Sequence, residues 1–229
     1  MKEKKIAGIK ATEYIQNNMI LGLGTGSTVY YMIEKVGELL RQGLNIKAVA
    51  TSQSTTNLAN EFKIPLISID EVERIDLVID GVDEIDGQFN AIKGGGGALF
   101  REKMVANIAD NVIWIMDSSK IVDSIGAFPL PVEILPYGCS HLLKKLRFLS
   151  LNPVLRVKED IPFITDNHNY IVDLHLGKEF DIKYVLQKLK GITGVLETGL
   201  FLNTCDKIII GTSDRVKVVE NHNKSKLMI

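Results

Sequence analysis

The 229-residue chain has few cysteines, no long apolar run and almost no net charge, and each of these features excludes a class of protein. Its two cysteines cannot form the disulfide framework of a secreted scaffold, and they indicate a reducing compartment. No apolar run approaches the ~20 residues that span a bilayer. Lys plus Arg (27) and Asp plus Glu (28) nearly cancel to a net charge of −1, which disfavours a nucleic-acid-binding protein with a basic surface. We therefore expect a cytoplasmic protein that binds neither nucleic acid nor membrane.

The sequence also lacks the spacing of common metal and nucleophile sites. The four histidines are scattered without a His-x-x-x-His pair, and the two cysteines do not form a Cys-x-x-Cys pair. No serine stands in a Gly-x-Ser-x-Gly elbow. We expect neither a metal nor a cofactor.

Short apolar runs that alternate with helical patterns are what the sequence does have. Runs of Ile and Val that are apolar throughout are typical of strands buried on both faces of a parallel sheet. The predicted strands are Met19–Gly24, Ile46–Thr51, Leu66–Ile69, Ile75–Asp80, Val112–Met116 and Lys207–Gly211. A helix is predicted over Val29–Leu40, with Gly43 near its C-cap. This alternation favours a doubly wound α/β domain.

The pattern changes after Ile121, where Phe128–Pro136 holds three of the six prolines and predicts a linker into a second unit. Strands and helices mixed around a hairpin at 166–169 predict a small α+β domain of ferredoxin-like type. Its predicted elements are the strands Val132–Leu135, Val154–Lys158, Tyr170–Leu174 and Gly194–Phe201 and the helices Cys139–Leu149 and Ile182–Lys190. We expect a discontinuous large domain of residues 1–129 and 205–229 around a small domain of residues 130–204.

The glycine-rich segment Gly22–Thr28 follows the first predicted strand and opens the first helix. Backbone N–H groups at a helix N-terminus favour an anion, and Ser27 and Thr28 add hydroxyl donors. A dinucleotide fingerprint fails because Ser27 replaces its third glycine and no acidic residue ends the second strand. A Walker A loop fails because no Lys precedes Ser27 or Thr28. The remaining alternatives are a small-phosphate site and a tight turn without a ligand.

The segment Asp80–Asp86 carries four acids in seven residues at the end of a predicted strand. Glu84 and Asp86 are expected in a solvated loop. Asp80 and Asp83 lie at the carboxyl end of the strand, where open α/β sheets bind ligands, so they can hold sugar hydroxyls or transfer protons. A magnesium site is the alternative, which the charge of nearby Lys93 disfavours.

The segment Lys93–Lys103 is the most specific, because four consecutive glycines follow its lysine. Each glycine costs up to ~1 kcal/mol relative to Ala in a regular element. A flexible linker would explain them, but a linker is seldom followed by a largely apolar helix. On that helix Glu102 falls among Ala98, Leu99, Val105, Ala106 and Ala109. Desolvation raises the pKa of a carboxylate in such a sector, which favours a general base over an exposed Glu.

Lys120 follows the predicted strand Val112–Met116 and can reach an anion at the same sheet edge. Together the four segments provide a phosphate cradle, two carboxylates, one lysine beside glycines and one semi-buried Glu, without a cofactor motif. This set is suited to cofactor-free proton transfer next to the carbonyl of a phosphorylated sugar.

Gly24–Thr28, Asp80–Glu84, Lys93–Gly96 and Arg101–Lys103 resemble the signature segments of type A ribose-5-phosphate isomerase. Phe128–Glu133 and Gly199–Phe201 also fit that family, and the resemblance runs from about Lys4 to Val219. It implies a Rossmann-like, mostly parallel sheet with helices on both faces, a small α+β domain in oligomer contacts, and a homodimer or homotetramer. It implies metal-independent interconversion of ribose 5-phosphate and ribulose 5-phosphate through an enediolate, in the non-oxidative pentose phosphate pathway.

The resemblance also implies a role for each matching residue. Glu102 would be the base, Lys93 would stabilise the oxyanion, and Asp80 and Asp83 would hold hydroxyls and assist ring opening. Substrate contacts are implied for Thr25, Gly26, Ser27, Thr28, Gly81, Val82, Gly94, Gly95 and Gly96, with Ser27 and Thr28 on the phosphate. Lys120 matches a further binding lysine. Lys4 matches an N-terminal lysine that reaches the phosphate, with Lys5 as the adjacent alternative.

Some positions depart from the family pattern: Gly97 where Ala is common, Phe100 where a small polar residue is frequent, His168 in place of a turn glycine, and Asp214-Arg215 where Asp-Gly is usual. The tail beyond Val219 is also longer than in many relatives. Two other functions stay open. A non-catalytic sugar-phosphate sensor on the same fold predicts binding without turnover, although the chain has no helix-turn-helix extension. A nucleotide-dependent oxidoreductase requires the fingerprint that this chain lacks.

Overall fold

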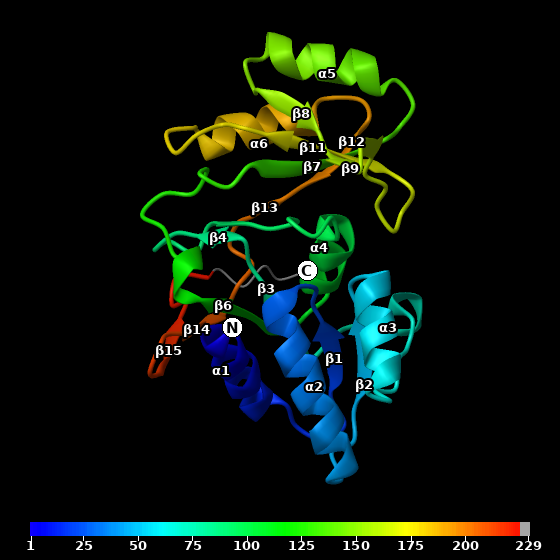
Figure 1. The fold of residues 1–229 in the computed structure, drawn as a ribbon, viewed down its shortest axis with the longest axis vertical. Helices are drawn as coiled ribbons and strands as arrows, with labels where there is room; N and C mark the ends of the chain where they lie inside the picture. The colour runs from blue at the N-terminus through cyan, green and yellow to red at the C-terminus, as the bar shows by residue number, and fades with distance from the viewer. Residues whose placement is uncertain (225–229) are drawn as a thin grey trace. The chain divides into compact units, whose positions relative to one another are not determined.

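The computed structural model describes residues 1–224, which form two compact units (Figure 1). The first unit consists of Met1–Val82, Arg101–Lys120 and residues 202–224. The second consists of Asp83–Phe100 and Ile121–Phe201. The domain boundaries expected at 129/130 and 204/205 stay a prediction. They differ from these units mainly because Asp83–Phe100 groups with the second unit.

The first unit is built on a six-stranded sheet with the order β15-β14-β6-β3-β1-β2. Its strands are β1 (Ile20–Leu23), β2 (Lys47–Ala50), β3 (Leu77–Gly81), β6 (Val112–Asp117), β14 (Lys207–Gly211) and β15 (Val216–Glu220). All neighbouring pairs are parallel except β14 and β15. The inner strands are buried on both faces, which confirms the interpretation of their unbroken apolar runs and the return of Lys207–Gly211 to this sheet.

Helices cover both faces of this sheet. α1 (Lys2–Ala11), α2 (Ser27–Arg41) and α3 (Gln53–Glu61) contribute to one apolar core with alternate residues of the strands, such as Leu21, Ile79 and Ile113. α1 and α2 lie side by side over the strands (Figure 1). α4 (Leu99–Asn107) packs on the other face, where Val105 lies against Gly22 of β1. A Cβ on Gly22 would come within 2.9 Å of Val105. The mostly parallel, doubly covered sheet confirms the α/β prediction.

The strand order places a topological switch point between β1 and β3. The chain passes from β1 to β2 on one side of β1 and then returns to β3 on its other side. Open α/β sheets bind ligands in the crevice beyond the carboxyl ends of the two strands at such a point. The loop after β1 and the last residues of β3 therefore occupy the expected ligand edge.

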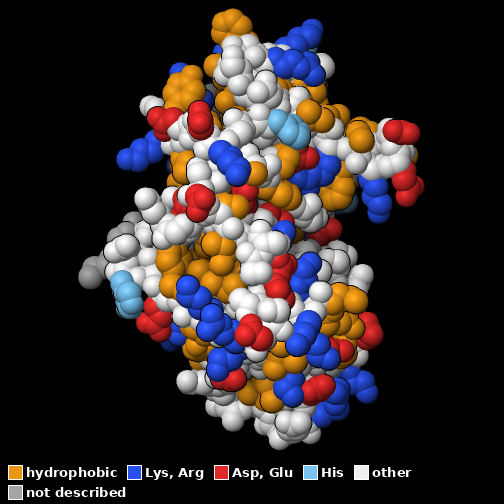
Figure 2. Space-filling model, turned by 60° about the vertical axis from the view of Figure 1, so that its left-hand side comes forward, with side chains coloured by type: hydrophobic (Ala, Val, Ile, Leu, Met, Phe, Trp, Pro, Cys, Tyr) orange, Lys and Arg blue, Asp and Glu red, His pale blue; other side chains and the backbone are white. Residues whose placement is uncertain are grey.

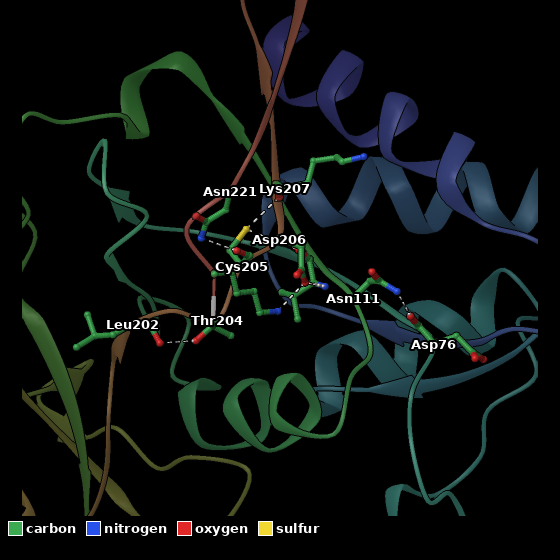
Figure 3. Close-up of polar contacts among 10 residues, drawn as sticks. Asp76, Asn111, Leu202, Thr204, Cys205, Asp206, Lys207 and Asn221 are labelled. Atoms are coloured by element: carbon green, nitrogen blue, oxygen red, sulfur yellow. Dashed lines mark hydrogen bonds and ion pairs between the residues drawn. The ribbon is translucent and has the colours of Figure 1, made fainter. Parts of the chain in front are cut away.

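At the other end of the strands, hydrogen bonds connect the segments around the amino ends of β6 and β14 (Figure 3). Asp206 Oδ2 accepts hydrogen bonds from Val112 N and Lys224 Nζ, both at 2.7 Å, and Asn221 Nδ2 donates to the Cys205 carbonyl at 2.9 Å. Burial raises the pKa of the Cys205 thiol to about 12, so it stays protonated. These contacts fix the returning C-terminal strands to the sheet.

The second unit contains a four-stranded antiparallel sheet with the order β12-β7-β11-β8. Its elements follow the chain order β7 (Leu130–Ile134), α5 (Cys139–Phe148), β8 (Pro153–Leu155), β11 (Tyr170–Leu174), α6 (Ile182–Lys190) and β12 (Val195–Thr198). This is a βαββαβ unit of ferredoxin-like type, as expected. Both helices pack on one core of the sheet, with Leu142 and Leu146 from α5 and Val185 and Leu189 from α6.

Smaller elements complete the two units. β4 (Glu84–Ile85), β5 (Ala91–Ile92) and β13 (Leu200–Phe201) form a three-stranded sheet, and β9 (Val157–Lys158) pairs with β10 (Ile161–Pro162). The 3₁₀ helices are η1 (Thr12–Tyr14), η2 (Ile69–Glu71) and η3 (Ser118–Lys120).

Some local predictions are wrong. Leu66 makes only an isolated bridge to Ala48 and η2 begins at Ile69, so Leu66–Ile69 is not a strand. The strand expected over Gly194–Phe201 is divided into β12 and β13. The patterns also missed α1, α3 and β15. α1 has no amphipathic pattern, and α3 is a short helix of mostly polar residues. Both helices form because they pack on the sheet.

The surface is mixed in charge on the face drawn in Figure 2, where Lys and Arg side chains (blue) are interspersed with Asp and Glu (red). Among residues 1–224, no helix is long and apolar enough to cross a membrane.

Candidate active site

The loop between β1 and α2 is held against the end of β3 by Asp80. Asp80 is 1% exposed, and its Oδ1 accepts hydrogen bonds from Thr25 N at 3.0 Å and Gly81 N at 2.7 Å. A Cβ on Gly24 would lie 2.0 Å from that oxygen, so only glycine allows the close approach. The segment predicted to bind an anion and the first predicted carboxylate therefore meet at the switch point.

A cluster of hydroxyl groups from the end of β2 to the start of α3 supports this loop. Thr25 Oγ1 lies 2.8 Å from the hydroxyls of Thr51 and Ser52, and Thr55 Oγ1 donates to the Gly24 carbonyl at 2.7 Å. The sequence reasoning missed these residues, although hydroxyl residues directly after a predicted strand were the signal that could have found them. These hydrogen bonds order the loop, and hydroxyl groups take the place of an acidic side chain at the end of β2.

Donors predicted to bind an anion lie at the start of α2. Gly26, with φ +126°, occupies the N-cap position, so the first N–H groups of the helix point outward. Lys4 Nζ, from α1, donates to Ser27 Oγ at 2.9 Å and lies 3.9 Å from Asp117 Oδ2 at the end of β6. The structure thus brings Lys4, rather than Lys5, to the predicted phosphate loop.

Asp117, at the end of β6, is surrounded by hydrogen-bond donors and positive charge. Burial alone raises its pKa, but the hydrogen bonds from the Ser119 hydroxyl and N–H and the charges of Lys4 and Lys120 outweigh burial and hold the pKa below its usual value. Lys120, in η3, contributes to lowering this pKa. Ser118 is fixed in turn, because its N–H and hydroxyl both donate to Glu3 of α1.

Glu102 lies in α4 of the first unit and is 5% exposed. Leu99, Val105 and Ala106 of the same helix are also buried, as the helical pattern predicts. The expectation of a carboxylate in an apolar sector is confirmed, and the alternative of an exposed Glu is wrong. A buried carboxylate of this kind suits proton transfer in a site from which water is excluded.

The second unit carries the other predicted residues, Asp83, Lys93 and the glycine loop, which we define as Gly94–Gly97. Asp83 Oδ2 accepts a hydrogen bond from Gly95 N at 2.7 Å. Lys93 is 2% exposed, its backbone N–H donates to the Gly199 carbonyl at 2.9 Å, and its Nζ lies 5.2 Å from the centroid of the Phe201 ring. The lysine is therefore a buried cation beside an aromatic face, and its main chain is anchored to the strand segment before β13.

The glycine loop is a structured turn. Gly97 N donates to the Gly94 carbonyl at 2.9 Å, and both residues have positive φ, +97° at Gly94 and +82° at Gly97. A Cβ on Gly97 would lie 2.4 Å from the Phe163 ring. Position 97 therefore requires glycine, because the backbone is left-handed there and Phe163 fills the space that a side chain would occupy.

Glu84 corrects one expectation for the acidic segment. It is 4% exposed rather than solvated, and it accepts hydrogen bonds from Gly126 N at 2.6 Å and Phe128 N at 3.3 Å. Its role is structural, since it ties the proline-rich segment to β4. Asp86 caps its own turn by accepting from Gln88 N and Asn90 N. Of the four acids, Asp80 and Asp83 thus remain as candidates for chemistry.

Comparisons with known proteins indicate the same family over most of the chain. The family model of ribose 5-phosphate isomerase A (phosphoriboisomerase A) matches residues 47–215. Ribose-5-phosphate isomerase A of Streptococcus sanguinis strain SK36 is 46% identical over 218 residues, which cover 95% of this chain and 97% of that protein. The protein of the same name from Limosilactobacillus reuteri strain DSM 20016 is 46% identical, with 94% and 96% covered.

Solved structures agree with the sequence comparison. Ribose 5-phosphate isomerase from Plasmodium falciparum superposes with a TM-score of 0.90 at 37% identity, covering 95% of this chain and 97% of that one. A D-ribose-5-phosphate isomerase solved in complex with phospho-erythronic acid gives a TM-score of 0.89 at 38% identity, with the same coverage. These similarities include segments from both compact units.

Proposed function

The chain belongs to the ribose 5-phosphate isomerase A family, and from this premise we propose that it interconverts D-ribose 5-phosphate and D-ribulose 5-phosphate. The observation that carries the proposal within the chain is Glu102, a carboxylate that is 5% exposed on an otherwise apolar side of α4. Isomerisation of an aldose to a ketose requires one base that removes a proton from one carbon and returns it to the next. A single buried carboxylate is suited to both steps.

The proposed reaction moves one proton from C2 to C1 and one from O2 to O1, and it leaves the atom count unchanged. Glu102 takes the proton from C2 of the open-chain aldose, and the C2–H electron pair forms the C1–C2 double bond of an enediolate while negative charge develops on O1. The hydroxyl proton transfers from O2 to O1, and Glu102 returns its proton to C1. The C2 carbonyl of the ketose results, and the carboxylate is regenerated.

Charged groups of both units are assigned to the other steps. Lys93 is the cation for the developing oxyanion, which is supported by its burial beside Phe201, because a desolvated charge acts more strongly. Asp80 and Asp83 accept hydrogen bonds from sugar hydroxyls and assist opening of the furanose ring. Their carboxylates are held by backbone N–H groups of Thr25, Gly81 and Gly95, which supports a fixed orientation for such contacts.

The phosphate is assigned to the start of α2. Ser27 and Thr28, the first N–H groups of the helix, Lys4 and Lys120 provide donors and positive charge suited to a dianion. Thr25, Gly26, Gly81, Val82 and Gly94–Gly96 complete the proposed contacts through main-chain groups. A homodimer or homotetramer, with the small domain in its contacts, and a cytoplasmic location stay predictions of the family resemblance.

The first test of the proposal is turnover without metal. Purified protein is expected to convert ribose 5-phosphate to ribulose 5-phosphate, and excess EDTA is expected to leave kcat unchanged, because the proposed steps use only side chains. Formation of the ketose is followed by absorbance in the presence and absence of EDTA. Tight binding of the sugar phosphate without turnover would instead support a sensor, and loss of turnover with EDTA would refute metal independence.

The phosphate assignment predicts an effect of Lys4 and Lys120 on KM. Lys4→Met and Lys120→Met are each expected to raise KM for ribose 5-phosphate about 10-fold to 100-fold, since a hydrogen bond to a charged group contributes roughly 1.5–3 kcal/mol. Inhibition by phospho-erythronic acid is expected to weaken in parallel. The matched control is Lys5→Met on the same helix, because Lys5 is exposed. An effect at Lys5 but not at Lys4 would contradict the assignment.

A further inference from the structure

We propose that Arg156 is the positioning residue that holds the glycine loop and, through it, the Asp83 carboxylate in the geometry needed for turnover. Arg156 lies in the second unit, between β8 and β9, far from the glycine loop in sequence. Its Nη1 donates to the Gly94 carbonyl at 3.0 Å and to the Gly95 carbonyl at 3.1 Å. The inference rests on the proposed function, because that function assigns chemistry to Asp83 and Lys93.

A single peptide group connects Arg156 with Asp83. The carbonyl of Gly94 accepts from Arg156, and the N–H of the same peptide group, on Gly95, donates to Asp83 Oδ2 at 2.7 Å. A trans peptide is planar and rigid, with its oxygen and its N–H on opposite sides. Rotation of this group would therefore break both hydrogen bonds together. Arg156 thus fixes the position of the Gly95 N–H that donates to the Asp83 carboxylate.

Arg156 is itself fixed on two sides. Its Nε and Nη2 donate to the two oxygens of Asp173, on β11, at 2.8 Å and 2.5 Å. Its guanidinium carbon lies 5.8 Å from the centroid of the Phe163 ring, and Phe163 packs against Gly97. Only 15% of the arginine side chain is exposed. A planar guanidinium can make the paired carboxylate contact and the two carbonyl contacts at the same time, whereas the ammonium group of lysine cannot reproduce that geometry.

The loop needs such an anchor because of its composition. Glycine loses more backbone freedom on ordering than any other residue, and Gly95 and Gly96 are exposed rather than packed. Lys93 directly precedes the loop, so its buried side chain shares the same main chain. Disorder in Gly94–Gly97 would displace both Lys93 and the donor to Asp83, and a displacement of about 1 Å can cost roughly 100-fold in rate.

The test compares Arg156→Gln, Arg156→Lys and Asp173→Asn with Arg147→Gln, an exposed arginine on α5 of the same unit. Arg156→Gln is expected to lower kcat about 10-fold to 100-fold. KM is expected to rise by a smaller factor, because the disordered loop loses sugar contacts while the phosphate site at the start of α2 is unchanged. Arg156→Lys is expected to recover only part of kcat, and Asp173→Asn to lower it less than Arg156→Gln. Arg147→Gln is expected to behave as the wild type.

Amide hydrogen exchange separates positioning from a general loss of stability. In Arg156→Gln, exchange in the peptide covering Gly94–Gly97 is expected to rise at least tenfold, while peptides from β7, α5 and α6 keep their wild-type rates. Unchanged exchange in the loop, an unchanged kcat, or exchange that rises equally throughout the second unit would each overturn the proposal. Addition of guanidinium ion to Arg156→Ala provides a second route, with partial recovery of kcat expected.

Failure of the proposed function would give a different result. If the wild type does not isomerise ribose 5-phosphate, the function is refuted, and the exchange experiment still decides whether Arg156 orders the loop. If the wild type turns over and Arg156→Gln is equally active with a disordered loop, the positioning role is refuted and the function stands.

Discussion

Glu102→Gln is expected to lower kcat about 10²–10⁴-fold, the usual contribution of a general base. Glutamine keeps the size and shape of the side chain and one acceptor oxygen, but its amide cannot accept the proton from C2. The fold is expected to persist, because a neutral amide is no more costly to bury at this 5% exposed position than a carboxylate. The measurement is kcat with ribose 5-phosphate, together with exchange of the C2 hydrogen into deuterated water, which is expected to stop.

The matched control for this substitution is Glu61→Gln, which makes the same chemical change at an exposed position on α3. It is expected to leave kcat and the midpoint of thermal unfolding at their wild-type values. A Glu102→Gln variant that folds and retains most of its turnover would remove Glu102 from the mechanism. Continued C2 exchange without ketose formation would assign Glu102 to a later step than the first proton transfer.

Lys93→Met is expected to lower kcat about 10²–10³-fold, as removal of one oxyanion-stabilising donor does in other enzymes. Methionine retains an unbranched apolar chain that can stay beside Phe201, but the positive charge is lost. KM is expected to change little, because the charge acts on an oxyanion that develops only after binding. Steady-state kinetics with ribose 5-phosphate measures both constants, and thermal unfolding reports whether the variant is folded.

Lys188→Met provides a control with the same local contact. Lys188, on α6, is exposed, and its Nζ lies 5.2 Å from the Tyr184 ring centroid, the same distance that Lys93 has from Phe201. It is expected to leave kcat unchanged, because its charge is solvated. If Lys93→Met raised KM alone and left kcat intact, Lys93 would be a binding group and the oxyanion assignment would be wrong.

The sheet and the small domain could be predicted because their apolar patterns are strong. β14, β11 and α6 begin and end at the predicted residues, since a buried strand or an amphipathic helix is specified by its own periodicity. α1 and α3 could not be predicted in this way. Their buried faces consist of few residues, such as Ala7, Ala11 and Ala59, and become apolar surfaces only when the sheet is present.

The acidic segment shows the same limit for function. Asp80, Asp83, Glu84 and Asp86 have similar chemistry and lie within seven residues, so sequence spacing alone does not separate their roles. The structure separates them by their partners. Asp80 holds the β1–α2 loop, Asp83 binds the glycine loop, and Glu84 accepts hydrogen bonds from Gly126 N and Phe128 N. Burial and donors, which depend on segments distant in sequence, decide the difference.

By itself, the sequence determined the chemical groups available to this protein: a glycine-rich loop with hydroxyl residues at a strand end, two carboxylates, a lysine before four glycines, and a Glu on an apolar helix face. These are local features, because periodicity and neighbouring residues specify them. Only the tertiary structure decided which long-range contacts hold the groups in place. Lys4 at Ser27, the hydroxyls of Thr51 and Thr55 around Thr25, and Arg156 at Gly94 join residues at least 23 positions apart, and no periodicity encodes such contacts.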